Sequence, residues 1–132
     1  MKHFESKPIV VNSPAVAVYS RFSDFNNMRN IMPDRVEEFS STQSTCTFKL
    51  KGLPDITLDM IETVPNSKIV YATHDQKPVD IKMGITIMEV DSTTSKIVMY
   101  IDAMVDGVIG AMLSKPLQNM LDMMAEKLEK KI

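Results

Sequence analysis

The chain has 132 residues, of which 44% are hydrophobic and 24% charged, and its formal net charge is -2 at pH 7. This length and composition predict a single domain over residues 1–132 that can build a core without disulfides or metal, and the weak negative charge argues against a nucleic-acid partner. With one cysteine (Cys46), no long apolar run and no signal-like start, the sequence predicts a cytoplasmic protein without membrane insertion.

The N-terminal part is predicted to form one strand followed by two short helices. Residues 2–12 have strand character and end before Ser13 and Pro14, which fit the N-cap and the first position of a helix. Apolar positions at helical spacing continue to residue 22. A second short helix is predicted over residues 23–32, where a proline ends it.

From Arg35 onward, alternation of apolar and polar residues replaces the helical spacing, and six antiparallel strands are predicted before Met104. Short turns join them, which is typical of a meander. The last strand is apolar on both faces, so either both faces are covered or one meets a partner subunit. The clearest alternation falls in residues 45–50, 56–60 and 79–87.

One long amphipathic helix is predicted from Asp106, as its cap, to Ile132. Pro116 lies inside it and predicts a kink or break between Ser114 and Leu117, giving two segments. Only the preceding strands can cover the apolar stripe, so a curved sheet should wrap around the helix. The stripe consists of Ile109, Met112, Leu113, Leu117, Met120, Leu121, Met124, Leu128 and Ile132.

Three sequence features and the order of the elements resemble the START-like superfamily of helix-grip proteins. The features are Ser13-Pro14-Ala15 followed by Val18-Tyr19, the Phe25-Asn26-Asn27-Met28 segment ending at Pro33, and the C-terminal helix. The superfamily is also called SRPBCC, polyketide cyclase/dehydrase and lipid-transport, or Bet v 1-like. The resemblance spans essentially the whole chain.

The resemblance implies an α+β helix-grip fold, with a curved antiparallel β-sheet of about seven strands wrapped around a long C-terminal α-helix and two short helices after the first strand. It also implies a cavity between sheet and helix that holds an apolar ligand. The tryptophan usual in the second short helix is absent, and Met28 or Ile31 would take its place in packing.

Methionine is unusually frequent, with 12 residues against no Trp. Flexible thioethers repack around different shapes, which suits a pocket for varied apolar ligands, although each methionine alone is ordinary core filler. The side chains predicted to bind such a ligand are Phe48, Leu58, Met60, Tyr71, Met83, Ile85, Met99, Ile101, Met112, Pro116 and Met120.

The two histidines, His3 and His74, have no metal-ligand spacing, so no metal or cofactor is predicted. His74 is interpreted as a surface residue at a strand end, because the adjacent Asp75 would point to the opposite face. By the same alternation, Asp59 and Asp80 should lie on the exposed convex face.

Asp102 and Tyr100 are the only weak catalytic candidates. They share one face of the last strand and could either form a hydrogen-bonded pair inside the cavity, able to transfer a proton, or lie beside each other in solvent. Solvent exposure is the commoner outcome for such a pair and is the favoured interpretation.

Binding of a small hydrophobic ligand (lipid, polyketide or aromatic) is therefore the leading hypothesis. One alternative is a polyketide cyclase/dehydratase-like enzyme that uses Asp102 and Tyr100. The other is a homo-oligomeric interaction domain, such as a homodimer formed through the last strand. No Gly-x-Ser-x-Gly elbow is present, so nucleophilic hydrolysis has no support.

Overall fold

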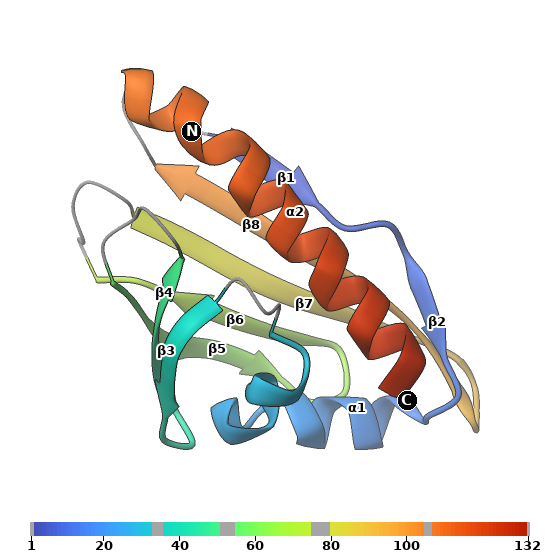
Figure 1. Ribbon diagram of the computed structural model, residues 1–132. Coiled ribbons are helices and arrows are strands. Elements are labelled where there is room, and N and C mark those ends of the chain that lie inside the picture. The colour runs from blue at the N-terminus through green and yellow to red at the C-terminus, as the bar shows by residue number, and fades with distance from the viewer. Residues whose placement is uncertain (1, 33–35, 51–54, 75–79, 105–106, 132) are drawn as a thin grey trace.

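The computed structural model describes residues 2–32, 36–50, 55–74, 80–104 and 107–131. These residues form an antiparallel sheet of eight strands whose inner face is crossed by the long helix α2 (Gly107–Lys131), with α1 (Ala15–Phe22) and the 3-10 helix η1 (Phe25–Asn30) at one end (Figure 1). The strands are β1 (Lys2–Glu5), β2 (Ile9–Val11), β3 (Val36–Ser41), β4 (Thr45–Leu50), β5 (Ile56–Val64), β6 (Lys68–Ala72), β7 (Asp80–Asp91) and β8 (Thr94–Met104).

The strand order is β1-β8-β7-β6-β5-β4-β3, with β2 also paired to β8. Each consecutive pair from β3 to β8 is antiparallel, which confirms the predicted meander and the predicted helix-grip architecture. None of the helices in the described ranges is long and apolar enough to cross a membrane.

The single N-terminal strand predicted over residues 2–12 is divided into β1 and β2. Glu5 pairs with Tyr100 and Ile9 with Ile97, so four steps along the N-terminal segment correspond to three along β8. Ser6 bridges the break: its N–H donates to the Met99 carbonyl at 2.8 Å, and its Oγ accepts the Met99 N–H at 3.0 Å. The extra residue is thus accommodated as an irregularity at the sheet edge.

The two short helices follow the prediction except for the cap of the first. Pro14, not Ser13, occupies the N-cap of α1, and its carbonyl accepts the N–H of Val18 at 3.1 Å. The Ser13 carbonyl instead accepts the Ser95 hydroxyl at 2.7 Å. Asp24 caps η1 by accepting the Asn26 N–H, which confirms the predicted restart. The proposed stop at Pro33 lies outside the described residues.

Alternation along β7 and β8 separates the two faces of the sheet. Residues facing α2 are buried, whereas the intervening ones face outward with Lys82 exposed and Tyr100 half-buried. Tyr100 lies across Gly84 so closely that a Cβ at residue 84 would overlap its ring. The inner-face residues are Ile81, Met83, Ile85 and Ile87 on β7 and Ile97, Met99, Ile101 and Ala103 on β8.

Helix α2 is continuous through Pro116, so the predicted break between Ser114 and Leu117 is wrong. Proline removes the donor that would bond the carbonyl four residues earlier, at Met112. Met112 is 68% exposed, so water can solvate that carbonyl. The proposed ends at Asp106 and Ile132 lie outside the described residues, as do the side chains of Ile109 and Leu113.

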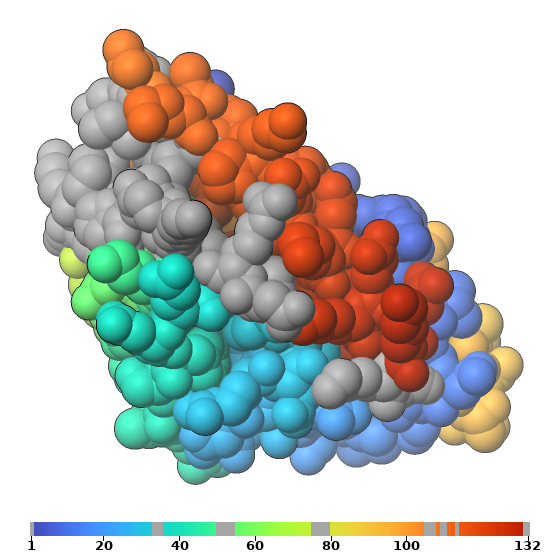
Figure 2. Space-filling view, viewed as in Figure 1, coloured from blue at the N-terminus to red at the C-terminus, as the bar shows by residue number. Residues whose placement is uncertain are grey.

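Among the stripe residues whose side chains are described, those from Leu117 to Leu128 are buried and Met112 is exposed. Met112 lies on the side of α2 away from Leu117, because at 3.6 residues per turn the two residues are about 140° apart around the helix axis. The first turns of α2 stand out at one corner of the molecule (Figure 2), with Val108 76% exposed. The buried residues of α2 are Leu117, Met120, Leu121, Met124, Ala125 and Leu128, each at 0–2% exposure.

Polar contacts fix the position of α2 along the sheet edge. Lys2 Nζ donates to Ser114 Oγ at 3.1 Å, and Gln118 Nε2 donates to the Glu5 carbonyl at 2.9 Å. Near the other end, Lys127 Nζ donates to the Met32 carbonyl at 2.8 Å. Because Lys2 pairs with Ala103 near the end of β8, the turns of α2 before Ser114 extend beyond the edge strand (Figure 1).

Candidate functional site

The core between the inner face of the sheet and the helices that cover it holds most of the side chains predicted to contact a ligand. Eight of the eleven are buried to 2% exposure or less and belong to one core cluster, while Met60 and Pro116 are partly buried and Met112 is exposed. The eight are Phe48, Leu58, Tyr71, Met83, Ile85, Met99, Ile101 and Met120.

Methionines enter this core from three directions. They come from the sheet, from α2 and from η1 with the residues that follow it. Unbranched thioether side chains change rotamer at low cost, so a core built from both walls in this way can adjust to a guest molecule. The buried methionines are Met28, Met32, Met83, Met99, Met120 and Met124.

The few polar groups on the inner face of the sheet already have hydrogen-bond partners. The Tyr71 hydroxyl donates to the Phe22 carbonyl at 2.6 Å, and its ring packs on Phe25 with centroids 4.6 Å apart. Burial raises the pKa of Tyr71 and raises that of the Cys46 thiol to about 12. Within the described residues, every buried side-chain polar atom has a partner. This surface therefore offers a ligand apolar contact.

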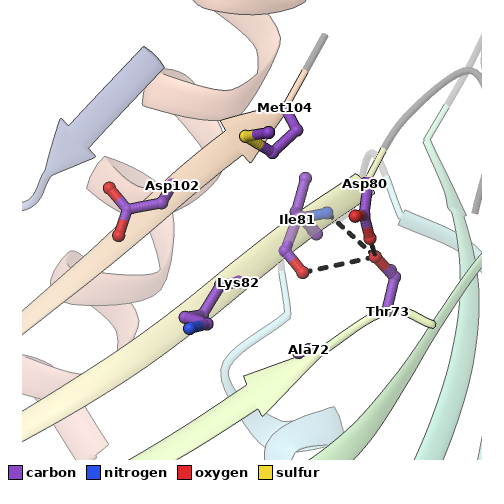
Figure 3. Close-up of a pocket in the computed structure, with 7 residues that line it drawn as sticks. All are labelled: Ala72, Thr73, Asp80, Ile81, Lys82, Asp102 and Met104. Carbon is purple, nitrogen blue, oxygen red and sulfur yellow. Dashed lines mark hydrogen bonds between the residues drawn. The ribbon is translucent and has the colours of Figure 1, made fainter. Parts of the chain in front are cut away.

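A hollow lies on the opposite, outer face of the sheet (Figure 3). It has a volume of about 230 Å³. One side is held by Thr73, whose hydroxyl donates to Asp80 and accepts the Ile81 N–H at 2.9 Å. Asp102 borders the hollow on the β8 side. The lining residues are Ala72, Thr73, Asp80, Ile81, Lys82, Asp102 and Met104.

Asp102 and Tyr100 lie on this outer face, so the interpretation that places them inside the cavity is wrong. Their neighbours Met99 and Ile101 face inward, and alternation along β8 turns the other two away. Asp102 accepts from Nδ1 of His3 at 2.5 Å and keeps 25% side-chain exposure. The favoured interpretation, solvent exposure of Asp102 beside Tyr100, has the correct face, although both residues are half-buried rather than exposed.

The contact between His3 and Asp102 was not predicted from the sequence. The residues are 99 positions apart, and only the antiparallel pairing of β1 with β8 brings them opposite each other. His3 Nε2 also lies 3.2 Å from Glu5 Oε1, and its ring stacks on that of Tyr100 at 5.9 Å. A histidine near the N-terminus carries no signal for this arrangement until the strand order is known.

His74 lies at the surface beyond the end of β6, as predicted, and its partner among the described residues is Asp59. Its Nε2 lies 2.8 Å from Asp59 Oδ2, and Asp75 lies outside the described residues. Asp59 and Asp80 alternate with the inward-facing Leu58 and Ile81 and so lie on the outer face, as predicted, although both are half-buried rather than exposed. No three His, Cys, Asp or Glu side chains converge as metal ligands in the described part of the chain.

Comparison with known proteins places this architecture in a structural class. No family model matches the sequence, and no curated protein matches it. A START superfamily protein from Mycobacterium smegmatis matches with a TM-score of 0.76 and 15% identity, over 98% of this chain and 96% of that one. The XoxI protein from Bacillus cereus matches with a TM-score of 0.76 and 13% identity, over 98% and 94%.

The di-domain ARO/CYC protein BexL of the BE-7585A biosynthetic pathway also matches. The TM-score is 0.66 at 18% identity, over 98% of this chain and 47% of BexL. At these identities the likeness shows the fold. The chain thus has the START-like helix-grip fold that the sequence resemblance implied.

Proposed function

We propose that this protein binds a small hydrophobic ligand of lipid, polyketide or aromatic type between the inner face of the sheet and α2. The observation that carries the proposal is the composition of the two facing walls. Both contribute buried methionines, and their described polar atoms are paired, so a ligand would gain mainly from leaving water.

The N-terminal half of α2 is the proposed place of entry. From Leu117 onward the helix is buried on the sheet, whereas Pro116 and Ser114 are only partly covered. In the proposed site the ligand would contact Pro116 and Met120 on α2. On the sheet side it would contact Met83 and Ile101. Shifting the first turns of α2 would open this region without unpacking the rest of the helix.

The likeness to the ARO/CYC protein BexL makes a cyclase-like reaction the second candidate. Proton transfer would need an acid or base on the inner face. The described titratable groups there are Tyr71, whose hydroxyl is bonded to Phe22, and Cys46, and burial raises the pKa of both. This favours binding over proton transfer by Asp102 and Tyr100, which lie on the other face. Homodimer formation and a cytoplasmic location remain predictions.

Met120→Trp tests the proposed site. Met120 is 2% exposed on the inner side of α2, so an indole there should occupy ligand space and weaken binding of a fluorescent fatty acid about tenfold or more. Met88→Trp is the matched control, because Met88 is 64% exposed on the outer side of β7, and it should leave binding unchanged. The chain has no other Trp, so each variant also carries one fluorescence reporter.

Titration of the wild type and both variants, with thermal melts alongside, gives a clear outcome. If the region around Met120 is solid core, overpacking would lower the free energy of unfolding of Met120→Trp by roughly 1–3 kcal/mol. A melting temperature lowered to that extent, together with no probe binding by the wild type, would require the binding proposal to be abandoned.

A further inference from the structure

His3 occupies a position where its charge state controls how many contacts it makes. It lies on β1 with its side chain 51% exposed on the outer face of the sheet. Nδ1 lies 2.5 Å from Asp102 on β8, and Nε2 lies 3.2 Å from Glu5 on the same strand. An imidazolium donates from both nitrogens, whereas neutral imidazole donates from one, so only the protonated ring satisfies both carboxylates.

The charged groups around His3 favour this protonated form. Asp102 has no other cation within 4 Å in the described part of the molecule, although Lys82 is its register partner on β7. Tyr100 stacks on the imidazole from the β8 side. Of the other charged groups on these elements, Asp80 is on β7 and Lys2 donates to Ser114 of α2. On α2, Lys115 follows Ser114, and Asp122 accepts from Gln118.

β1 joins the sheet to the first half of α2. It is an end strand whose sheet partner is β8. On its other side, Lys2 donates to Ser114 and Gln118 donates to the Glu5 carbonyl. These two contacts to α2 flank His3 along the strand. Loosening of β1 from β8 would therefore weaken two of the contacts that hold the part of α2 between Ser114 and Gln118.

We propose that His3 is a pH-dependent latch: its protonated ring holds β1 on β8 and, through β1, holds the N-terminal half of α2 against the sheet. Loss of the proton releases one carboxylate contact, and both elements become freer to open. That this opening controls entry of a hydrophobic ligand rests on the proposed function. The latch itself depends only on the contacts of β1.

The direction of the pH effect follows from the contacts. The hydrogen bond to Asp102, with that to Glu5, raises the pKa of His3 above its ordinary value of 6.5. A raised folded-state pKa means that the stabilisation is fully present below the unfolded pKa and is lost as pH rises through the folded value. The latch should therefore be closed below the ordinary pKa of 6.5 and should open as pH rises through the raised pKa of His3.

Amide hydrogen exchange on the intact chain tests the latch without any ligand. After correction for the intrinsic pH dependence, protection of residues 2–5 and 114–118 in the wild type should fall about three- to tenfold between pH 6 and pH 8.5. His3→Gln and Asp102→Asn should each abolish this change. His74→Gln removes the other histidine, which pairs with Asp59 away from β1, and should behave as the wild type.

Two results would overturn the latch. One is protection in the wild type that does not change with pH, and the other is an unchanged pH response in both His3→Gln and Asp102→Asn. Neither result depends on ligand binding, so a failure of the latch is distinct from a failure of the proposed function, which the Met120→Trp titration tests.

Discussion

Gly84→Ala is expected to lower the free energy of unfolding by about 1–3 kcal/mol, the usual range for overpacking. A Cβ at residue 84 would occupy the space of the Tyr100 ring, which lies flat across the glycine. The ring must then swing away and uncover this part of the outer face, including Val70, the buried register partner of Gly84 on β6. Urea unfolding of the purified variant measures the change.

A double-mutant cycle identifies the cause. Tyr100→Ala removes the ring and creates room for the methyl group, so adding Gly84→Ala to Tyr100→Ala should cost much less than adding it to the wild type. An equal cost in both backgrounds would show that the glycine is needed for another reason. No cost in the wild type would show that the ring does not lie over Gly84.

Leu121→Ala should have the largest effect on stability, about 2–5 kcal/mol, through lost burial and the cavity left behind. Leu121 is 0% exposed in the half of α2 that packs on the sheet. Met112→Ala is the matched control on the same helix. At 68% exposure it should change the unfolding free energy by no more than about 0.5 kcal/mol.

Together, Leu121→Ala and Met112→Ala test which part of α2 packs against the sheet. Similar losses in both would contradict the structure, because they would require the first turns of α2 to be buried like the last. Chemical denaturation is suitable for this comparison, since equal m-values would show that both variants unfold from equally compact states.

The sheet could be predicted from sequence because its signals are local. Strict alternation in β7, from Ile81 to Ile87, reflects one buried and one exposed face, and the structure keeps that pattern except at Gly84, which the Tyr100 ring covers. The stripe from Leu117 to Leu128 likewise predicted the buried side of α2. Met112 was wrongly included in this stripe, because at 3.6 residues per turn it lies about 140° from Leu117 around the helix.

The errors arose where tertiary contacts override a local rule. Pro116 suggested a break, but α2 continues through it, and Met112, whose carbonyl loses its helical donor, is an exposed residue. The division of β1 from β2 depends on how Ser6 bonds to Met99 across the sheet. The contact of His3 with Asp102 depends entirely on β1 pairing with β8, which no local pattern specifies.

The central claim is that a hydrophobic ligand occupies the methionine-rich space between sheet and helix. Methyl NMR of protein carrying ¹³C-labelled methionine tests it most directly, because the 12 methionines report on both faces of the sheet. Adding a short-chain fatty acid should shift the methyl signals of Met83, Met99 and Met120, which are buried at 2% exposure or less. The signals of Met88 and Met104, exposed on the outer face, should stay in place; shifts confined to these exposed methyls, or no shifts at all, would contradict the claim.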